Sequence, residues 1–317
     1  MTAARAVGIM GPGGPEVVTV IEREIPEPGA GEVRLAVKAA PVHPSDSVPR
    51  TRGFQGVPPP WVAGWDCAGV VESIGPEVDG LAVGDEVMAI VVPWRPEGGA
   101  QTELLLAPAG SVVPIPQGAS LEQASTLPMN ALTAISGLEP LGLTEGQTLA
   151  VTGGAGLLAS YVIGIAKHRG LRVLADARPE DEELVRGFGA DVVLPRGAGM
   201  VEAMVEAAPG GVDAVYDTAL LTRSVFPGIR EGGSIVPVRG WDGDAVEEGI
   251  HVHPVYVWTV VDRSDWLEEA RALASRGVLA LRVAATYPPE RAGDAQRRME
   301  AGGLRGRAVN VFTDGSG

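Results

Sequence analysis

The sequence predicts an α/β protein with a β-rich domain and a parallel-sheet domain, and three observations support this fold class. The chain has 317 residues, which is too many for one ordinary hydrophobic core. Residues 1–119 hold many short apolar stretches between glycine and proline turns, a pattern typical of a small β-barrel. From residue 120, short apolar strands alternate with helical segments, as in βαβ units around a parallel sheet.

The strands of the first domain are expected from alternation and from the turns that end them. In EVRLAVKAA, the side chains of Val33, Leu35, Val37 and Ala39 fall on one face of an extended chain. CAGVVESIG is expected to be a strand that ends at a Gly-Pro turn. Two further strands are expected in GDEVMAIVV and AQTELLLAP.

The second domain is expected to begin with a helix at Ser120, which forms a capping box with Gln123. Pro128 then either kinks this helix or starts another one. Strands are expected in TLAVTG, LRVLADA, DVVLP, VDAVYDT, GSIVPV and HVHPVYVW, with helical segments between them, the last of these at 222–230.

A strand–helix–strand pattern returns in the last part of the chain, from LRVAATYPPE to AVNVF. This segment is expected to rejoin the β-rich domain. The predicted organisation is therefore a β-rich domain at 1–119, a cofactor domain at 120–280 and a returning segment at 281–317.

The stretch VTGGAGLLASY, residues 151–161, places three glycines between a strand and a helix that Gly170 closes. A side chain at such a turn would block a pyrophosphate, while the N–H groups and dipole of the helix N-terminus attract an anion. The helix must also pack closely on its strand, and the small residue one turn into it is Ala159. We therefore expect a dinucleotide cradle rather than a plain turn. Its expected residues are Thr152, Gly153, Gly154, Ala155, Gly156, Leu157 and Leu158.

The cofactor's ribose is expected at the end of the next strand, in LADARPED. Asp176 lies near the position where a carboxylate binds the ribose 2′-hydroxyl of NAD. If Asp176 points away, Arg178 can bind a 2′-phosphate instead, which predicts NADPH as the cofactor. The alternative is that Arg178 is a solvated surface charge.

Composition and charge exclude several classes of protein. The net charge of −15 argues against a nucleic-acid or anionic-membrane surface. No run approaches the roughly 18 apolar residues of a membrane span, and MTAARAVGIMGPGG does not resemble a secretory signal. The single cysteine, Cys67, excludes an internal disulfide and is expected to be a small buried hydrophobe. We expect a cytoplasmic, reducing location.

A series of motifs in a fixed order carries a resemblance that spans nearly the whole chain. They are APVHPSD, VAGWDCAGVVESIGPEV, LAVGDEVMAI, GGAQTELLL, LPMNALTAISGL, the glycine turn, VRGFGADVVL and AGGLRGRAVNVF. Together they resemble the medium-chain dehydrogenase/reductase superfamily, in its zinc-independent quinone oxidoreductase (zeta-crystallin-like) branch.

The resemblance implies a GroES-like N-terminal domain, a Rossmann cofactor domain and an active site in the cleft between them. It implies NADPH-dependent reduction of quinones or α,β-unsaturated carbonyls. Asp46 matches the family's aspartate near the cleft, Asn130 its segment at the nicotinamide end, and Arg307 its C-terminal signature. The chain departs from the family at His43, where the branch has asparagine, and at Ala159, where it has a third glycine.

No metal is expected at this site. The alcohol-dehydrogenase branch binds zinc through a cysteine, a His-Glu pair and a further ligand, but here His43 replaces the cysteine and Trp65-Asp66 replaces His-Glu. His251 and His253 could place both rings on one face of a strand. Because no third ligand is evident, we interpret them as edge or interface residues.

The groups expected to carry the chemistry are those that can stabilise or protonate an oxyanion after hydride transfer. They are His43, Asn130 and the indoles of Trp65 and Trp94, with solvent as an alternative donor. A structural or ribose-binding role for His43 stays open, and Asp46 is expected to orient a loop. Tryptophans at 61, 65 and 94 predict an aromatic-walled pocket for a polycyclic or quinonoid substrate, or else are core and rim residues.

Other functions remain open at this point. One is a trans-acting enoyl reductase that tailors a polyketide-like metabolite. Others are a non-redox NADPH-binding protein and a lyase or cyclase that kept the fold. The strand in IHVHPVYVW predicts, through the resemblance, a homodimer that pairs across a two-fold axis.

Overall fold

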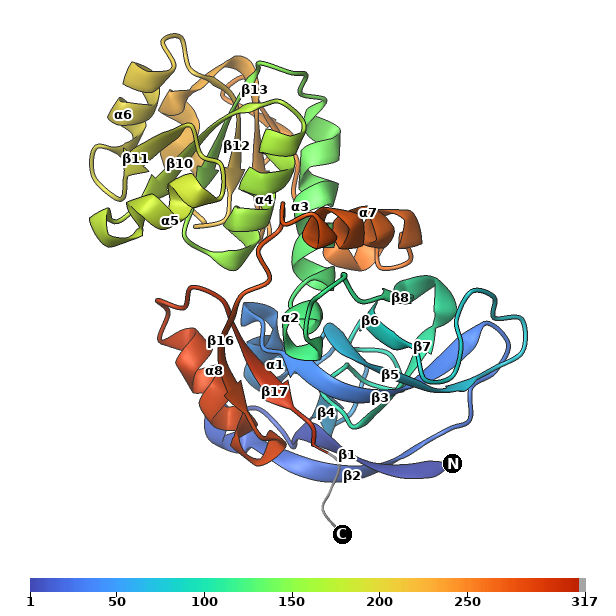
Figure 1. Ribbon diagram of the computed structural model, residues 1–317. Helices are drawn as coiled ribbons and strands as arrows, with labels where there is room; N and C mark the ends of the chain where they lie inside the picture. The colour runs from blue at the N-terminus through green and yellow to red at the C-terminus, as the bar shows by residue number, and fades with distance from the viewer. Residues whose placement is uncertain (314–317) are drawn as a thin grey trace. The chain divides into compact units, whose positions relative to one another are not determined.

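The structure is a computed structural model that describes residues 1–313, and the chain divides into two compact units (Figure 1). Unit 1 comprises Met1–Met129, Val261–Ser275 and the segment that begins at Leu281, and unit 2 comprises Asn130–Val260 and Arg276–Ala280. Unit 2 therefore starts about ten residues later than the expected boundary at 119/120, and residues 261–275 belong to unit 1. Among residues 1–313, no helix is long and apolar enough to cross a membrane.

Unit 1 is built from two sheets of mostly antiparallel strands. The larger sheet has the order β16 (Val283–Tyr287), β17 (Arg307–Val311), β3 (Glu32–Pro41), β5 (Asp66–Ile74), β6 (Glu86–Ile90) and β8 (Val112–Pro114), and β7 (Leu104–Pro108) also pairs with β3. The smaller sheet has the order β2 (Val18–Ile25), β1 (Thr2–Ile9) and β4 (Trp61–Val62). The expected alternation in β3 is confirmed for Val33, Leu35 and Val37, which are buried in the core of this unit, but not for Ala39: the register shifts between Val37 and Ala39, and Ala40 joins that core instead.

The helices of unit 1 have between 5 and 12 residues, and the capping box predicted at the start of one of them is present. They are α1 (Val48–Arg52), α2 (Leu121–Ser125), α7 (Ser264–Ser275) and α8 (Ala292–Glu300). Ser120 caps α2 by accepting from the Gln123 N–H, and the Gln123 side chain accepts from the Ser120 N–H. The next helix, α3 (Pro128–Leu138), begins at Pro128, so this proline starts a second helix and does not kink the first.

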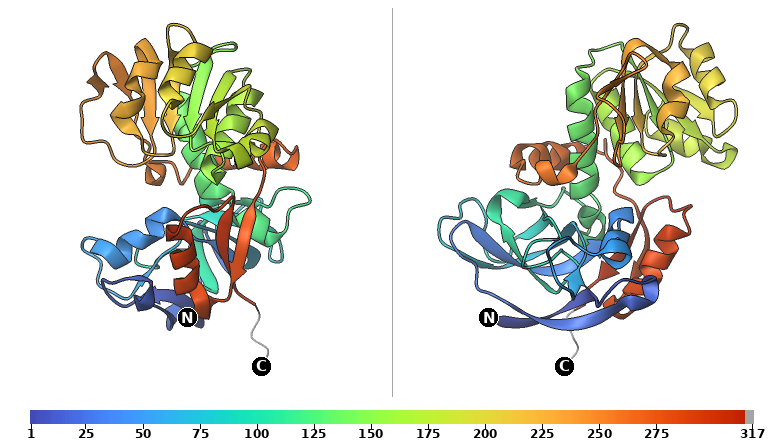
Figure 2. Two further views of the ribbon diagram at one scale, coloured as in Figure 1. Left: turned by 90° about the vertical axis from the view of Figure 1, so that its left-hand side faces the viewer. Right: turned by 180° about the vertical axis from the view of Figure 1, so that it is seen from behind.

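Unit 2 contains a seven-stranded sheet that is parallel except for its edge strand β14. Its order is β11 (Val192–Pro195), β10 (Arg172–Ala177), β9 (Thr148–Thr152), β12 (Val212–Asp217), β13 (Ile229–Pro237), β15 (Ile250–Val252) and β14 (Val246–Glu247). Helices α4 (Leu157–His168), α5 (Glu182–Gly187) and α6 (Met200–Ala207) connect these strands, and helices flank both faces of the sheet (Figure 2). The strand order reverses between β9 and β12, where doubly wound sheets bind their ligands.

Two expected elements of unit 2 differ from the structure. The helical segment predicted at 222–230 is a 3₁₀ helix, η6 (Thr222–Gly228), that ends two residues early and has Pro227 inside it. The strand expected across HVHPVYVW ends at Val252. Pro254 explains the early end, because proline has no N–H to donate to a neighbouring strand.

Candidate active site

The glycine turn lies between β9 and α4, at the carboxyl edge of the unit 2 sheet. Gly153 has a φ of +70°, and its N–H donates to a carboxylate oxygen of Asp176. A Cβ at Gly154 would lie 2.7 Å from the Asp176 carbonyl oxygen, so this position accepts no side chain without a shift of the backbone. The Gly156 N–H donates to the Gly153 carbonyl at 2.8 Å, and Gly156 is the N-cap of α4. The turn is therefore tight and held in place by the end of β10.

A second buried aspartate ties β12 to the same edge. Asp217 is fully buried and accepts the Thr152 hydroxyl at 2.6 Å and the Thr222 N–H at 2.8 Å. The Thr152 hydroxyl oxygen in turn accepts the Ala219 N–H at 3.0 Å. These bonds order the loop after β12 against the glycine turn.

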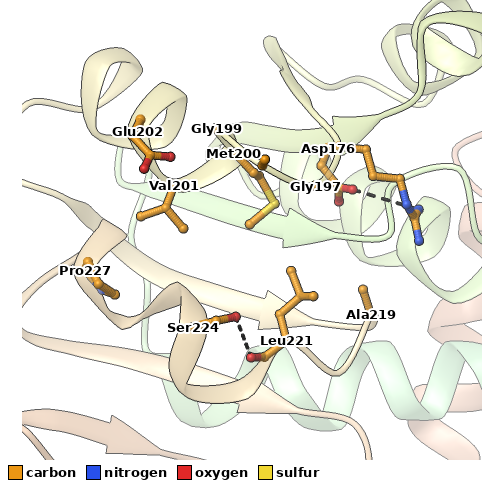
Figure 3. A pocket seen from close by; sticks show the side chains of 12 residues that line it. Asp176, Gly197, Gly199, Met200, Val201, Glu202, Ala219, Leu221, Ser224 and Pro227 are labelled. Atoms are coloured by element: carbon orange, nitrogen blue, oxygen red, sulfur yellow. Dashed lines mark hydrogen bonds and ion pairs between the residues drawn. The ribbon is translucent and has the colours of Figure 1, made fainter.

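A pocket of about 520 Å³ opens beside this turn, in the loops that follow β10, β11 and β12 (Figure 3). Its polar side chains are those of Asp176, Arg196, Glu202 and Ser224, and Met200, Val201 and Leu221 supply apolar surface. A partly apolar pocket with a few polar groups, at the carboxyl ends of parallel strands, is where α/β proteins bind nucleotides.

Asp176 faces the pocket and the glycine turn and does not point away. One of its carboxylate oxygens binds the Gly153 N–H, and the other, Oδ2, lies 3.9 Å from Nη1 of Arg196 (Figure 3, dashed line). Burial raises the pKa of Asp176, against the lowering effects of the turn N–H groups and Arg196. Arg178 lies outside the pocket lining; its side chain is 57% exposed, with Glu180 at 3.8 Å. Sequence analysis missed Arg196, whose only signal was its position just after the expected strand DVVLP.

The remaining predicted residues of the turn fit a helix start. Ala155 and Leu157 are buried, Leu158 is partly exposed, and Ala159 is fully buried where the helix was expected to pack closely. Gly170 follows the end of α4 with a φ of +77°.

In unit 1, His43, Asp46 and Asp66 form a buried cluster. His43 Nε2 lies 2.7 Å from Asp66 Oδ1, and the side chains are 1% and 0% exposed. The other oxygen of Asp66 accepts the Met129 N–H at 2.9 Å. Sequence analysis named His43 and Asp46 but missed the pairing of His43 with Asp66.

Asp46 holds three segments of unit 1 together. Its Oδ2 accepts the His43 N–H at 2.8 Å and the Gln101 side-chain amide at 3.1 Å, and its Oδ1 accepts the Gly64 N–H at 3.2 Å. Burial raises the pKa of Asp46 to about 6, with His43 and the N–H donors acting in the opposite direction. This geometry supports the expected role of Asp46 in orienting its loop.

Two of the three tryptophans of interest contact each other near the cluster. Trp65 and Trp94 pack edge to face, with ring centroids 5.2 Å apart, and Phe54 packs on Trp94 at 6.1 Å. Trp65 is buried, whereas Trp94 is 37% exposed. The Trp61 indole donates to the Val57 carbonyl at 2.8 Å and packs in a small core with Ile9, so it is a core residue.

The other residues named from the sequence are distributed over both units. Asn130 is buried at the start of unit 2, and Arg307 is half-buried in β17 of unit 1. Cys67 is fully buried, and burial raises the pKa of its thiol, as expected for a residue that is not a nucleophile. His251 lies on β15, while His253 lies beyond the end of that strand. Within the part of the chain that the structure describes, no three His, Cys, Asp or Glu side chains gather as a metal site.

A β-rich unit joined to a doubly wound parallel sheet with a glycine turn is the architecture of a nicotinamide-dependent oxidoreductase. Residues 29–117 match the alcohol dehydrogenase GroES-like domain family, and residues 188–309 match the zinc-binding dehydrogenase family. A protein of the alcohol dehydrogenase superfamily from Novosphingobium aromaticivorans has a similar structure, with a TM-score of 0.88, 26% identity, and 98% of this chain and 100% of that chain covered.

Two relatives carry more specific names. The trans-enoyl reductase tazE of Aspergillus terreus is 34% identical over 61% of this chain and 69% of its own length. The chloroplastic NADPH-dependent alkenal/one oxidoreductase of Arabidopsis thaliana is 33% identical over 68% of this chain and 57% of its own length. The chain belongs to the medium-chain dehydrogenase/reductase superfamily, in its zinc-independent quinone oxidoreductase branch.

Proposed function

We propose that this protein is an NADPH-dependent reductase that transfers hydride to a quinone or an α,β-unsaturated carbonyl without a metal ion. The observation that carries the proposal is the pocket in unit 2, whose wall holds Arg196 and also Asp176, the carboxylate that accepts the Gly153 N–H of the glycine turn. The name of the Arabidopsis relative, an NADPH-dependent alkenal/one oxidoreductase, supports both the cofactor and the type of acceptor.

The residues of unit 2 fit a bound dinucleotide. Glycines at 153 and 154 let the turn pack tightly on the end of β10 and the loop after β12, and the N-terminus of α4 that follows the turn favours the pyrophosphate. In our proposal Arg196 binds the 2′-phosphate, because it lines the pocket while Arg178 does not. Asp176 already accepts the Gly153 N–H and faces a cation, so it is less available to a ribose hydroxyl than in an NAD site.

The residues of unit 1 fit an acceptor with a flat apolar body. Trp94 is 37% exposed, and its ring packs edge to face with Trp65 and with Phe54. NADPH supplies the hydride when bound, and the protein supplies orientation and an environment for the developing oxyanion. Without a metal ion, that oxyanion needs a hydrogen-bond donor or a proton from the chain or from water.

A trans-acting enoyl reductase is the second candidate, favoured by the relative from Aspergillus terreus. Both candidates share hydride transfer to a polarised C=C bond, and they differ in whether the substrate is free or bound to a carrier. A homodimer is also proposed; the β15 edge expected to pair across the two-fold axis is covered by β14 at His251 and Ile250, so pairing would use β14 itself.

The decisive experiment mixes the purified protein and NADPH with an ortho-quinone, an enone, and an enoyl thioester on a carrier protein. Loss of reduced-nicotinamide absorbance with the free acceptors, and a preference over NADH, would support the quinone and enone reductase. Turnover of the carrier thioester alone would favour the trans-enoyl reductase. NADPH binding without turnover of any acceptor would contradict both candidates and point to a non-redox role.

A further inference from the structure

The unit 2 pocket holds two acidic side chains and one basic side chain. Among residues 1–313, the charged side chains that line it are those of Asp176, Arg196 and Glu202. Asp176 is buried near the end of β10, whereas Glu202 is exposed on α6 and lies across the pocket from it (Figure 3). Arg178 and Glu180, on the loop after β10, form an exposed ion pair outside the pocket lining. An anion that enters this pocket therefore meets one buried carboxyl group and one cation.

The two oxygens of the Asp176 carboxyl group have different surroundings. One oxygen accepts the Gly153 N–H, which fixes the carboxyl group to the glycine turn. The other oxygen, Oδ2, accepts no hydrogen bond from the described residues, and the ion pair with Arg196 spans 3.9 Å from Oδ2 to Nη1. This distance is too long for a hydrogen bond. Oδ2 is therefore the oxygen that can bind a proton without losing an existing hydrogen bond.

The guanidinium of Arg196 is held in place only by this ion pair. Within the part of the chain that the structure describes, it makes no hydrogen bond and no other ion pair, and the side chain is 45% exposed. Guanidinium and phosphate form charge-assisted hydrogen bonds, which are shorter and stronger than a carboxylate pair at 3.9 Å. A phosphate in the pocket can therefore draw the cation away from Asp176 without breaking a hydrogen bond.

Such a movement changes the proton affinity of Asp176. Burial raises the pKa of this carboxyl group, and the N–H groups of the turn and the charge of Arg196 act in the opposite direction. A phosphate that binds the guanidinium weakens one of these opposing effects and adds a negative charge to the same pocket. Both changes raise the pKa of Asp176 further, because a nearby like charge disfavours the ionised form.

We propose that Asp176 takes up a proton from solvent when NADPH binds, and that its protonated Oδ2 then donates a hydrogen bond to the 2′-phosphate that Arg196 also binds. This inference rests on the proposed function, because it requires NADPH as the cofactor. NADH binds without this proton, since its 2′-hydroxyl is uncharged and leaves Arg196 beside the ionised carboxylate. Asp176 therefore couples cofactor choice to pH, and the preference for NADPH over NADH decreases as the pH rises.

The test counts protons and measures affinity, and it needs no turnover. Isothermal titration calorimetry with NADPH and with NADH, in buffers of different ionisation enthalpy, gives the number of protons taken up with each nucleotide. The same titrations between about pH 6 and pH 8 give both Kd values as a function of pH. Because the 2′-phosphate also titrates near about pH 6, the protons of Asp176 are obtained as a difference between wild type and a variant that binds the same phosphate.

Asp176→Asn is the test variant, since asparagine keeps an oxygen for the Gly153 N–H but cannot titrate. Asp191→Asn is the matched control. Asp191 also accepts a backbone N–H of β10, that of Val173 at 2.7 Å, and it also pairs with a cation, Lys167, at 2.9 Å. It lies at the other end of β10, away from the pocket. Thermal unfolding establishes first that both variants are folded.

With NADPH, we expect the wild type to take up more protons than Asp176→Asn, by up to about one per nucleotide. With NADH, the wild type and Asp176→Asn should take up equal numbers. As the pH rises, the Kd for NADPH should increase more steeply in the wild type than in Asp176→Asn, by up to about tenfold per pH unit, the limit for one coupled proton. Asp191→Asn should behave as the wild type in every titration.

Equal proton numbers and equal pH slopes for NADPH in the wild type and Asp176→Asn would overturn the inference while leaving an NADPH-binding protein. If Asp176→Asn does not fold, infrared difference spectra of the wild type decide. NADPH, but not NADH, should then produce the C=O band of a newly protonated carboxyl group, and the absence of that band would overturn the inference. A wild-type protein that binds no NADPH would instead contradict the proposed function, and the inference with it.

Discussion

Asp176 and Arg196 face each other in the unit 2 pocket, with Oδ2 and Nη1 3.9 Å apart, although Arg196 comes 20 residues after Asp176 in the chain, beyond α5 and β11. The parallel sheet explains their proximity, because the carboxyl ends of β10 and β11 lie at one edge. The arginine is about half-exposed and the aspartate is buried. The side chain that can move toward a ligand is therefore the cation.

The first prediction concerns cofactor choice. Replacing Arg196 with alanine should raise the Kd for NADPH about 10- to 100-fold, the equivalent of one charge-assisted hydrogen bond of about 1.5–3 kcal/mol. The Kd for NADH should change little, because NADH has no 2′-phosphate. Fluorescence titration with both nucleotides measures the two values.

Arg178→Ala is the matched control, since this arginine lies on the neighbouring loop but outside the pocket lining. We expect its Kd values to stay within about twofold of the wild type. A larger loss of NADPH affinity in Arg178→Ala than in Arg196→Ala would return the 2′-phosphate contact to the residue that the sequence indicated.

The second prediction concerns the glycine turn. An alanine Cβ at Gly154 would lie 2.7 Å from the Asp176 carbonyl oxygen, 3.1 Å from Ala175 Cβ and 3.3 Å from a methyl of Val185. Such overpacking should lower the free energy of unfolding by about 1–3 kcal/mol and weaken binding of both nucleotides. Urea unfolding and fluorescence titration measure these effects.

Gly187→Ala provides the comparison within unit 2. Gly187 ends helix α5, and a Cβ there meets no atom within 4 Å. This variant should keep full nucleotide affinity and gain up to about 1 kcal/mol of stability, because alanine favours helix. Equal losses of nucleotide affinity and of unfolding free energy in Gly154→Ala and Gly187→Ala would show that the close contacts at Gly154 do not exclude a side chain from the turn.

The sequence could predict elements whose signals are local. The alternation in β3, the Ser120 capping box and the strand–turn–helix at Gly153 each depend on residues within about one element's length. The resemblance then ordered these elements into two domains. For the same reason Ala159 could be named as the small residue of the α4 packing.

The missing parts depend on contacts between distant residues. His43 was named without Asp66, 23 residues later, because their contact depends on how β5 follows the loop after β3. Arg196 was missed because its place in the pocket wall depends on β11 lying beside β10, and hydrophobic periodicity does not encode the order of strands in a sheet. Phe54 was missed because its partner, Trp94, is 40 residues away in the chain.

The third prediction is a pH dependence of stability set by Asp46. Its folded-state pKa of about 6 lies above the ordinary value of 3.8, so the folded protein holds this proton more tightly than the unfolded chain. The protonation of Asp46 therefore stabilises the folded state below about pH 4, and this stabilisation is lost as the pH rises through about 6. Between these two pH values the free energy of unfolding falls by about 3 kcal/mol on account of Asp46.

Asp46→Asn isolates this contribution, since asparagine cannot titrate. The difference in unfolding free energy between wild type and variant should shift against the wild type from pH 4 to pH 7, as measured by urea unfolding at each pH. A difference that stays constant across this range would show that Asp46 has the same proton affinity in both states.

The last prediction concerns the acceptor. Trp94 is 37% exposed and is supported edge-on by Trp65 and Phe54, so alanine at this position removes a flat apolar surface without opening the core. Trp94→Ala should raise KM for a polycyclic quinone about 5- to 20-fold, which corresponds to an aromatic contact of about 1–2 kcal/mol. A small linear enone should be affected less, because it covers less of the ring. Trp266→Ala is the control: this tryptophan lies in α7 of unit 1 and stacks with Arg263, and its loss should leave both KM values unchanged. Equal KM values for the polycyclic quinone in wild type and Trp94→Ala would show that Trp94 does not contact the acceptor and has only a structural role.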